Sequence, residues 1–241
     1  MRPNDLRVAD ARRIGIVVAL PAEARTLDGL DNTTFDVLVT GPGPARAASG
    51  AEELIARGAG ALLSWGTSGA LQADLRPGQL VLASSVRDED GCRYASNEAW
   101  FRRMELAFAS LRPARAGCMT SAQPVGSVAA KHQLARASDC GAVDMEAAAV
   151  ARAAAAHALP FLAIRSIVDP IDCELPRCVL ASLDPSGEPR LAALLLTLLR
   201  RPWELGGLLR LALHFNSALR TLRRAALLMS STRQAVTVVN R

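Results

Sequence analysis

The sequence is poor in aromatic residues, in lysine and in histidine. Aromatic residues make up 4% of a chain that is 50% hydrophobic, so aliphatic side chains must fill its core. Lys131 is the single lysine among 28 basic residues, and the arginine excess is typical of a GC-rich coding sequence. No basic stripe with interleaved aromatics is present, which argues against nucleic-acid binding. The three histidines have no metal-ligand spacing with each other or with cysteine, so no metal site is expected: His132, His157 and His214.

Long apolar runs, a secretion signal and paired cysteines are also missing. No stretch of about 18 apolar residues occurs, so we expect no transmembrane helix. The first apolar run, residues 14–20, is too short for a signal-peptide core and leads directly to Pro21 and Glu23. The five cysteines are odd in number and form no CxxC pair, so reduced thiols in a cytoplasmic protein are expected. The net charge of +5 permits attraction to an anionic surface but identifies no partner.

Strand and helix patterns alternate along most of the chain. Residues 14–20 form a continuous apolar run with β-branched residues, as in a buried parallel strand. Residues 45–57 are typical of a helix that ends at Gly58. We therefore expect an α/β protein, a single domain over residues 1–241 with a central mixed, largely parallel sheet flanked by helices. The other strands are expected at residues 35–40, 61–65, 78–85 and 161–167 and around Cys118.

The C-terminal third has a different composition. Residues 191–199 are strongly apolar and lead to Trp203, and residues 204–229 predict a long helix with several arginines. One interpretation is two core or surface helices. The other is an apolar, Arg-rich helical extension on a membrane surface, with the arginines and Trp203 at the level of the lipid headgroups.

Two glycine-rich segments follow predicted strands. Residues 41–46 (GPGPAR) and 66–70 (GTSGA) are expected to be turns whose backbone N–H groups could approach an anion or a sugar oxygen. Arg46 could reach an anion from the first turn, or could simply be a solvated helix residue. Most such turns carry no ligand, so neither segment identifies a function by itself.

Three acids stand where a ligand site would need them. Glu23 lies just past the first strand, where open α/β sheets bind ligands, although an acid there also suits a helix N-terminus. Asp169 ends a strand before Pro170, and Arg165 is expected nearby to set its charge state; Asp169 could otherwise be a capping residue. Glu146 opens a nearly uncharged helix, and a buried acid is costly unless it is paired or functional.

Four segments, taken in order, resemble the superfamily of purine nucleoside phosphorylases and 5′-methylthioadenosine/S-adenosylhomocysteine nucleosidases. They are the first strand with Glu23, residues 66–69 (GTSG), residues 143–148 (VDMEAA) and residues 165–169 (RSIVD). The resemblance covers about residues 14–172. It implies cleavage of an N-glycosidic bond through an oxocarbenium-like transition state, without a cofactor and in a homo-oligomer.

The resemblance also implies roles for individual residues. Asp169 would protonate N7 of a purine, Glu146 would grip the ribose hydroxyls, and Glu23 would activate water. Arg165 would lie near the nucleophile. The substrate-binding residues would be Met145 on the ribose, Thr67 and Ser68 on the sugar or anion side, Val125 beside the base, and also Gly66 and Ser121.

The nucleophile is left open between water and inorganic phosphate. Phosphorylases of the superfamily place arginines at two positions that Glu23 and Ser64 occupy here, and both replacements favour water. Arg46, with Gly43 and Thr67, would instead provide a phosphate site.

Within the superfamily, the chain most resembles the hopanoid-associated phosphorylases. The similar segments are residues 20–24 (LPAEA), 40–43 (TGPG) and 64–70 (SWGTSGA), with the apolar, Arg-rich C-terminal extension. This likeness implies release of adenine from adenosylhopane, a lipid-linked nucleoside. Residues 175–203 would then be a helical insertion that contacts the inner face of the membrane. The alternatives are a soluble methylthioadenosine/S-adenosylhomocysteine nucleosidase and a non-catalytic nucleoside-binding protein.

Overall fold

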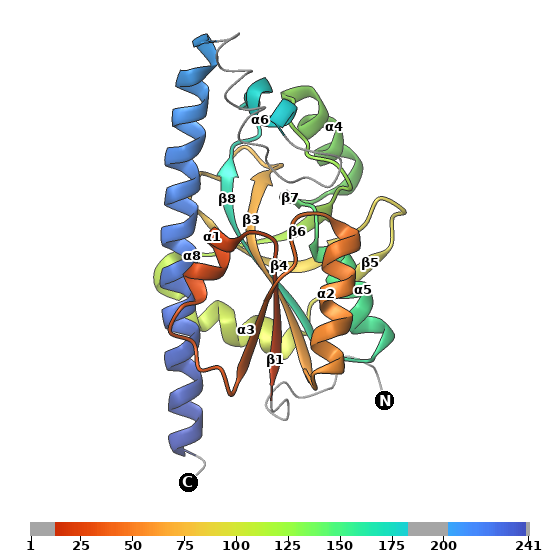
Figure 1. Cartoon of the computed structure of the whole chain (residues 1–241), viewed down its shortest axis with the longest axis vertical. Helices are drawn as coiled ribbons and strands as arrows, with labels where there is room; N and C mark the ends of the chain where they lie inside the picture. Colours follow the sequence, from red (N-terminus) through yellow and green to blue (C-terminus); the bar gives the residue numbers. More distant parts are fainter. Residues whose placement is uncertain (1–12, 183–201, 240–241) are drawn as a thin grey trace.

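The computed structural model describes residues 13–182 and 202–239 (Figure 1). It confirms the expected α/β architecture, a mixed sheet flanked by helices. Residues 191–199, and most of the expected insertion at 175–203, lie outside the described residues. The expected C-terminal helix is present as α8 and runs further than predicted, over Leu205–Val239. None of the described helices combines the length and apolar character that crossing a membrane requires.

The eight strands are joined in one sheet. Its hydrogen-bonded order is β2-β1-β3-β7-β6-β4-β5, and β8 pairs with both β3 and β4. The strands β3, β8, β4, β6 and β7 therefore form a closed ring, from which β1, β2 and β5 extend. The strand bounds are β1 Ile14–Val18, β2 Phe35–Val39, β3 Ala61–Ala70, β4 Leu80–Arg87, β5 Arg93–Ala95, β6 Ala114–Thr120, β7 Ala142–Asp144 and β8 Phe161–Asp169.

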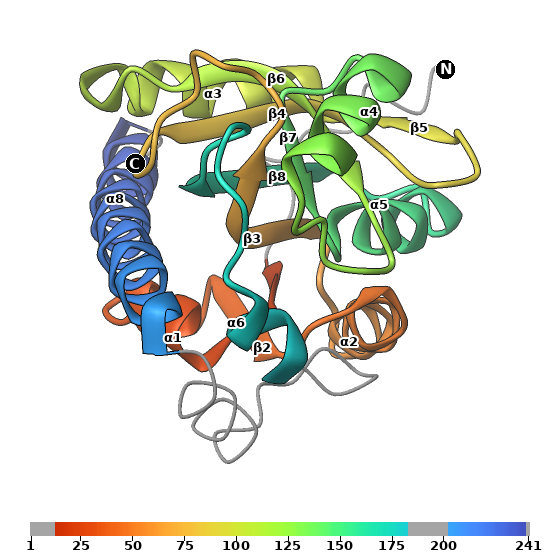
Figure 2. The ribbon, with the colours of Figure 1, turned by 90° about the horizontal axis from the view of Figure 1, so that it is seen from above.

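Helices cover both sides of this sheet. Seen from above, α8 lies on one side of β3 and β8, and α2 and α5 lie on the other (Figure 2). The other helices, including the short 3-10 turns, fill the edges and ends. The helix bounds are α1 Pro21–Ala24, η3 Arg25–Leu27, α2 Pro44–Ala56, α3 Glu98–Ala107, η4 Ala109–Leu111, α4 Val128–Ser138, α5 Ala147–Ala156, α6 Arg177–Ser182 and η5 Pro202–Glu204.

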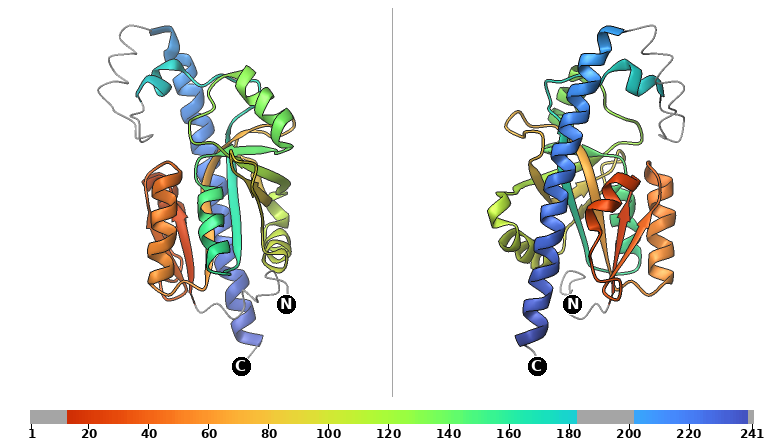
Figure 3. Two further views of the ribbon diagram at one scale, coloured as in Figure 1. Left: turned by 90° about the vertical axis from the view of Figure 1, so that its right-hand side faces the viewer. Right: turned by 60° about the vertical axis from the view of Figure 1, so that its left-hand side comes forward.

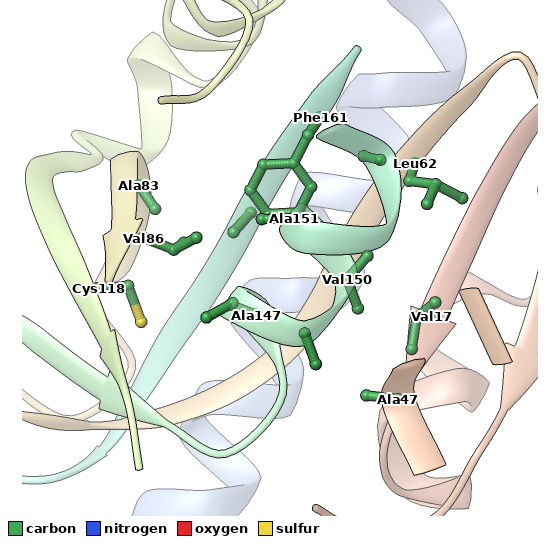
Figure 4. Close-up of a cluster of buried hydrophobic side chains, with 14 of the residues drawn as sticks. Val17, Ala47, Leu62, Ala83, Val86, Cys118, Ala147, Val150, Ala151 and Phe161 are labelled. Atoms are coloured by element: carbon green, nitrogen blue, oxygen red, sulfur yellow. The ribbon is translucent and has the colours of Figure 1, made fainter. Parts of the chain in front are cut away.

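Aliphatic side chains fill the core, as the shortage of aromatics predicts. On the α2/α5 side, the alanines of α5 let this helix pack closely against Phe161, Leu62 and Ala47 (Figure 4). On the opposite side, Leu222 and Met229 of α8 pack against the sheet. Burial of apolar surface of this kind is the main favourable contribution to folding.

The first half of α8 extends past the end of the strands, alongside α6 (Figures 1 and 3). Thr221 anchors the helix to the sheet by donating a 2.7 Å hydrogen bond from its hydroxyl to the carbonyl of Gly78. The helix is thereby fixed at its middle, and its beginning stands above the carboxyl ends of β3 and β8.

Candidate functional site

A cavity of about 460 Å³ lies beyond the carboxyl ends of β1, β3, β7 and β8. Ligands bind at this end of the strands in open α/β sheets. The first half of α8 and the segment before α4 complete the cavity wall. It is lined by Ala19, Leu20, Glu23, Pro42, Thr67, Ser68, Gly69, Gln123, Pro124, Val125, Val143, Asp144, Met145, Glu146, Val168, Asp169, Leu175, Val179, Leu208, Leu211, Ala212 and Phe215.

Glu23 is held in the cavity wall by three hydrogen bonds. Its Oε1 accepts from the backbone N–H and the hydroxyl of Thr67, both at 2.7 Å, and its Oε2 accepts from the N–H of Leu20 at 3.1 Å. The side chain is buried. Burial raises the pKa of this carboxyl, although the bonds from Thr67 and the charge of Arg165 oppose the shift. Glu23 is thus a carboxylate of increased basicity in a fixed orientation.

The expected turn at residues 66–70 is wrong, because these residues continue β3. Their glycines instead make room for carboxylates. A Cβ atom on Gly66 would lie 3.0 Å from Oε1 of Glu23, and one on Gly69 would lie 3.1 Å from both carboxylate oxygens of Asp169. The glycines are therefore explained by close approach of two acids within a strand, rather than by a turn that binds an anion.

Glu146 stands at the start of α5, as expected, and lines the cavity. Its Oε1 accepts a 2.8 Å hydrogen bond from the N–H of Gly43, and its Oε2 accepts a 3.3 Å bond from the N–H of Met145. Loss of hydration and the charge of Asp144 raise the pKa of Glu146 to about 7. This carboxyl therefore changes charge near neutral pH.

Arg165 lies behind the cavity, in a buried network. Its Nε donates to Oδ2 of Asp144 at 2.9 Å, and its Nη2 contacts the same oxygen and donates to Oγ of Ser64 at 2.6 Å. Asp144 also accepts from the hydroxyl of Thr120 at 2.6 Å and from the N–H of Ala147, the first residue of α5, at 2.9 Å. Arg165 does not line the cavity, and it anchors the strand ends that do.

Asp169 lines the cavity, as expected. The prediction that Arg165 is its charged partner is wrong. Arg165 pairs with Asp144, whereas Oδ2 of Asp169 forms an ion pair with Nζ of Lys131. Arg165 does not reach Asp169 because its side chain points to Asp144 at the end of β7, whereas Lys131 reaches Asp169 from α4.

Several other predicted residues do not line the cavity either. Arg46 lines a separate hollow between β2 and α2, with its guanidinium folded against Gly41, so it does not supply an anion site in the cavity. Ser121 donates its hydroxyl to Glu89 at 3.0 Å and does not line the cavity. Gly43 takes part only through its N–H bond to Glu146.

The expected sugar and base residues that do line the cavity are Thr67, Ser68, Met145 and Val125. Ser68 has a buried hydroxyl with no hydrogen-bond partner among the described residues. Gly66 lies behind Glu23 and is not part of the lining.

Three polar or charged residues of the site were not predicted from the sequence. Asp144 could have been found as a second acid two positions before Glu146, and Lys131 as the single lysine of the chain. Gln123, which brings an amide to the lining, carried no signal.

The cavity has an acidic end and an apolar end. Four carboxylates belong to the lining, and among the residues described no lysine, arginine or histidine does. The apolar end is formed by Leu175, Val179, Leu208, Leu211 and Phe215. The arrangement suits a ligand with a hydroxylated, electron-poor centre and an apolar extension.

Comparisons with known proteins identify the family and the fold. The sequence profile of the phosphorylase superfamily matches residues 30–200. No curated protein sequence matches the chain. Among solved structures, the futalosine hydrolase of Helicobacter pylori strain 26695 superposes with a TM-score of 0.69 at 17% identity, over 93% of this chain and 98% of the other. The 5′-methylthioadenosine/S-adenosylhomocysteine nucleosidase of Neisseria meningitidis, in complex with methylthio-immucillin-A, gives 0.68 at 15% identity, over 91% and 99%. At such low sequence identities, the similarity to these two structures shows a shared fold.

Proposed function

Because the chain belongs to the phosphorylase superfamily, we propose that it is an enzyme that cleaves the N-glycosidic bond of a purine nucleoside, with water as the nucleophile. The observation that carries the proposal is the placement of Glu23, Glu146 and Asp169 around one cavity. The fold shared with futalosine hydrolase and methylthioadenosine nucleosidases supports it.

In this mechanism each acid has a distinct task. Glu23 accepts a proton from a water molecule as the water oxygen bonds to C1′ of the ribose. The bond from C1′ to N9 breaks, and its electrons move into the purine. Asp169 enters this step protonated, donates its proton to N7 and leaves the step as a carboxylate paired with Lys131; the proton taken up by Glu23 returns to solvent before the next turnover. Glu146 accepts hydrogen bonds from the ribose hydroxyls and stabilises the positive charge that develops on the sugar, while Met145 packs on the ribose.

Water is preferred to phosphate on electrostatic grounds. Phosphate is an anion, and none of the described lining residues is cationic. Of the four lining acids, Asp144 and Asp169 are each in an ion pair, and Glu23 and Glu146 have no ion pair among the described residues. Arg165 is neutralised by its ion pair with Asp144. Repulsion between like charges in a partly desolvated site opposes phosphate binding. Phosphorolysis remains the alternative outcome of the experiments below.

The apolar end of the cavity favours a nucleoside with an apolar 5′ group. Once Glu146 holds the ribose and Asp169 the base, the leucines of α8 are left for the 5′ substituent. Adenosylhopane, the substrate of the hopanoid-associated subfamily, has such a group. Methylthioadenosine and S-adenosylhomocysteine are the alternative, with a smaller 5′ group.

Adenine release tests both the activity and the 5′ group. We expect the chain to release adenine from methylthioadenosine and from a long-chain 5′-alkyl-5′-deoxyadenosine. Each buried methylene contributes about 0.8 kcal/mol, so kcat/KM for the long-chain substrate should exceed that for methylthioadenosine by about tenfold or more. Equal values would favour the small-molecule nucleosidase. Binding without release of adenine would favour a non-catalytic nucleoside-binding protein.

Ionisation of Glu146 should control the pH dependence. Because its pKa is about 7, the carboxylate that receives the ribose hydroxyls is mostly protonated at pH 6 and charged at pH 8. We expect kcat/KM to rise about tenfold per pH unit below about pH 7 and to level off above it. Glu146→Gln should lower kcat/KM and abolish this rise. A rise that persists in the variant would assign the ionisation to another group.

A lipid-linked substrate would need contact with a membrane, and the start of α8 offers a surface for it. Trp203, Leu205, Leu209 and Leu213 are 50–73% exposed. The three leucines share one face of α8, next to the face that carries Leu208 toward the cavity. We propose that this face, with residues 175–203 as an access element, lies on the cytoplasmic surface of the membrane.

Vesicle flotation tests this contact. Replacement of Leu205, Leu209 and Leu213 by serine should weaken binding to anionic vesicles by about tenfold or more, because each leucine loses apolar surface that it would bury in the bilayer. The matched control is Leu227→Ser, on the same helix and 62% exposed. Equal binding of both variants would contradict membrane contact through this face.

A further inference from the structure

We infer that Lys131 is a positioning residue that fixes Asp169 for proton transfer to the leaving purine. This inference rests on the proposed function. Lys131 does not line the cavity, so it acts on the substrate only through Asp169.

Lys131 is fully buried, with 0% of its surface exposed. Its ammonium forms an ion pair with Oδ2 of Asp169 and donates to the carbonyls of Pro170 at 2.9 Å and Cys173 at 2.7 Å. An ammonium has three N–H donors, and each has one acceptor here. A buried charge is costly unless it is paired and hydrogen-bonded, and this lysine satisfies both conditions at Asp169.

The helix α4 brings this ammonium to a fixed place. Ser127 caps α4 by accepting a 3.2 Å bond from the N–H of Ala130, and its carbonyl accepts from the N–H of Lys131 at 3.1 Å. These two hydrogen bonds fix the first turn of α4, from which the lysine side chain extends. The same ammonium ties down the turn that follows β8, so the backbone next to Asp169 and its carboxylate are held together.

The ion pair with Lys131 gives the two carboxylate oxygens of Asp169 different roles. Oδ2 is occupied by the ammonium, and the described residues give Oδ1 no hydrogen bond, so Oδ1 is left for N7 of the purine. After proton transfer the negative charge remains beside the ammonium, which stabilises the product of the transfer. Misplacement of a catalytic group by about 1 Å can lower the rate about 100-fold. Loss of the ammonium should therefore lower the rate of the chemical step.

The arrangement of acceptors at position 131 suits lysine better than arginine. Three acceptors surround the nitrogen of Lys131, whose side chain has no exposed surface. A compact ammonium fits such a set, whereas the planar guanidinium of arginine presents its donors as a wide fork. In a chain whose other 27 basic residues, histidine aside, are arginines, this position carries a lysine.

The experiment compares two leaving groups attached to the same 5′-methylthioribose. Methylthioadenosine needs protonation of the leaving purine, whereas the 4-nitrophenyl riboside departs as a stable phenolate without it. We expect Lys131→Met to lower kcat about 100-fold for methylthioadenosine, with KM little changed, and to leave the 4-nitrophenyl substrate within about threefold of the wild type.

Matched controls separate positioning from folding. His132→Met, at the next and half-exposed position of α4, should leave kcat for both substrates unchanged. Combining Lys131→Met with Asp169→Asn should add little to the loss caused by Asp169→Asn alone, because both remove one function. If Lys131→Met does not fold, Lys131→Gln, which keeps two N–H donors, takes its place.

Equal losses on both substrates, or no loss on either, would overturn the role of Lys131. Failure of the proposed function is a different result: the wild-type chain would then release neither adenine nor nitrophenolate. A wild type active on both substrates, with a variant impaired only on the purine, would support the inference.

Discussion

Asp169→Asn is expected to lower kcat for a purine nucleoside by about 10²- to 10⁴-fold, the usual contribution of a general acid. The carboxamide keeps the size of the side chain and its contact with Lys131, but it has no acidic proton for N7. Protonation of the leaving group matters only in the transition state, so KM should change little. The measurement is steady-state adenine release together with isothermal binding of the substrate.

Asp172→Asn is the matched control for this variant. Asp172 is three residues further along, has a side chain 71% exposed and pairs with His132 at the surface. It should retain wild-type turnover. Near-normal turnover of Asp169→Asn would remove Asp169 from the mechanism, and equal impairment of both variants would indicate a local structural effect.

Glu23→Gln is expected to give the second large loss, again about 10²- to 10⁴-fold in kcat. The amide cannot accept a proton from water. In the wild type the carboxylate accepts hydrogen bonds from the N–H groups of Leu20 and Thr67. The NH₂ group of glutamine is itself a donor, so it would face one of these two N–H groups without a hydrogen bond. Unlike Asp169→Asn, this variant should be slow on the 4-nitrophenyl riboside as well, because attack by water is needed whatever the leaving group.

Chemical rescue distinguishes loss of the base from loss of structure. Glu23→Ala leaves space in the cavity wall that formate can enter, and formate should restore part of the activity. Glu53→Gln, at an exposed acid of α2 that pairs with Arg57, is the control and should behave as the wild type. A Glu23→Gln variant with undiminished hydrolysis would exclude Glu23 as the base.

The fold and the main acids of the site could be predicted because their signals are local. The apolar run at residues 14–20 identifies β1, and Glu23, Glu146 and Asp169 each stand at the end of a strand or the start of a helix. The closure of β8 onto both β3 and β4 could not be predicted, because pairing between distant strands leaves no local pattern.

The errors have physical reasons of the same kind. Glycine is rare in strands, so residues 66–70 favoured a turn, and only the carboxylates of Glu23 and Asp169 packed against them explain a strand there. Arg165 was expected beside Asp169, but Asp144, a residue of a three-residue strand, offers it a buried partner. The role of Lys131 depends on α4 and β8 meeting in space.

The most direct test of the central claim is the fate of the nucleophile's oxygen. The wild-type chain is incubated with methylthioadenosine in ¹⁸O-labelled water, with and without inorganic phosphate, and the sugar product is analysed by mass spectrometry at the earliest time point. Hydrolysis predicts free methylthioribose with one ¹⁸O at C1, formed at the same rate in both samples. A sugar 1-phosphate that forms only with phosphate and carries no ¹⁸O would contradict the account.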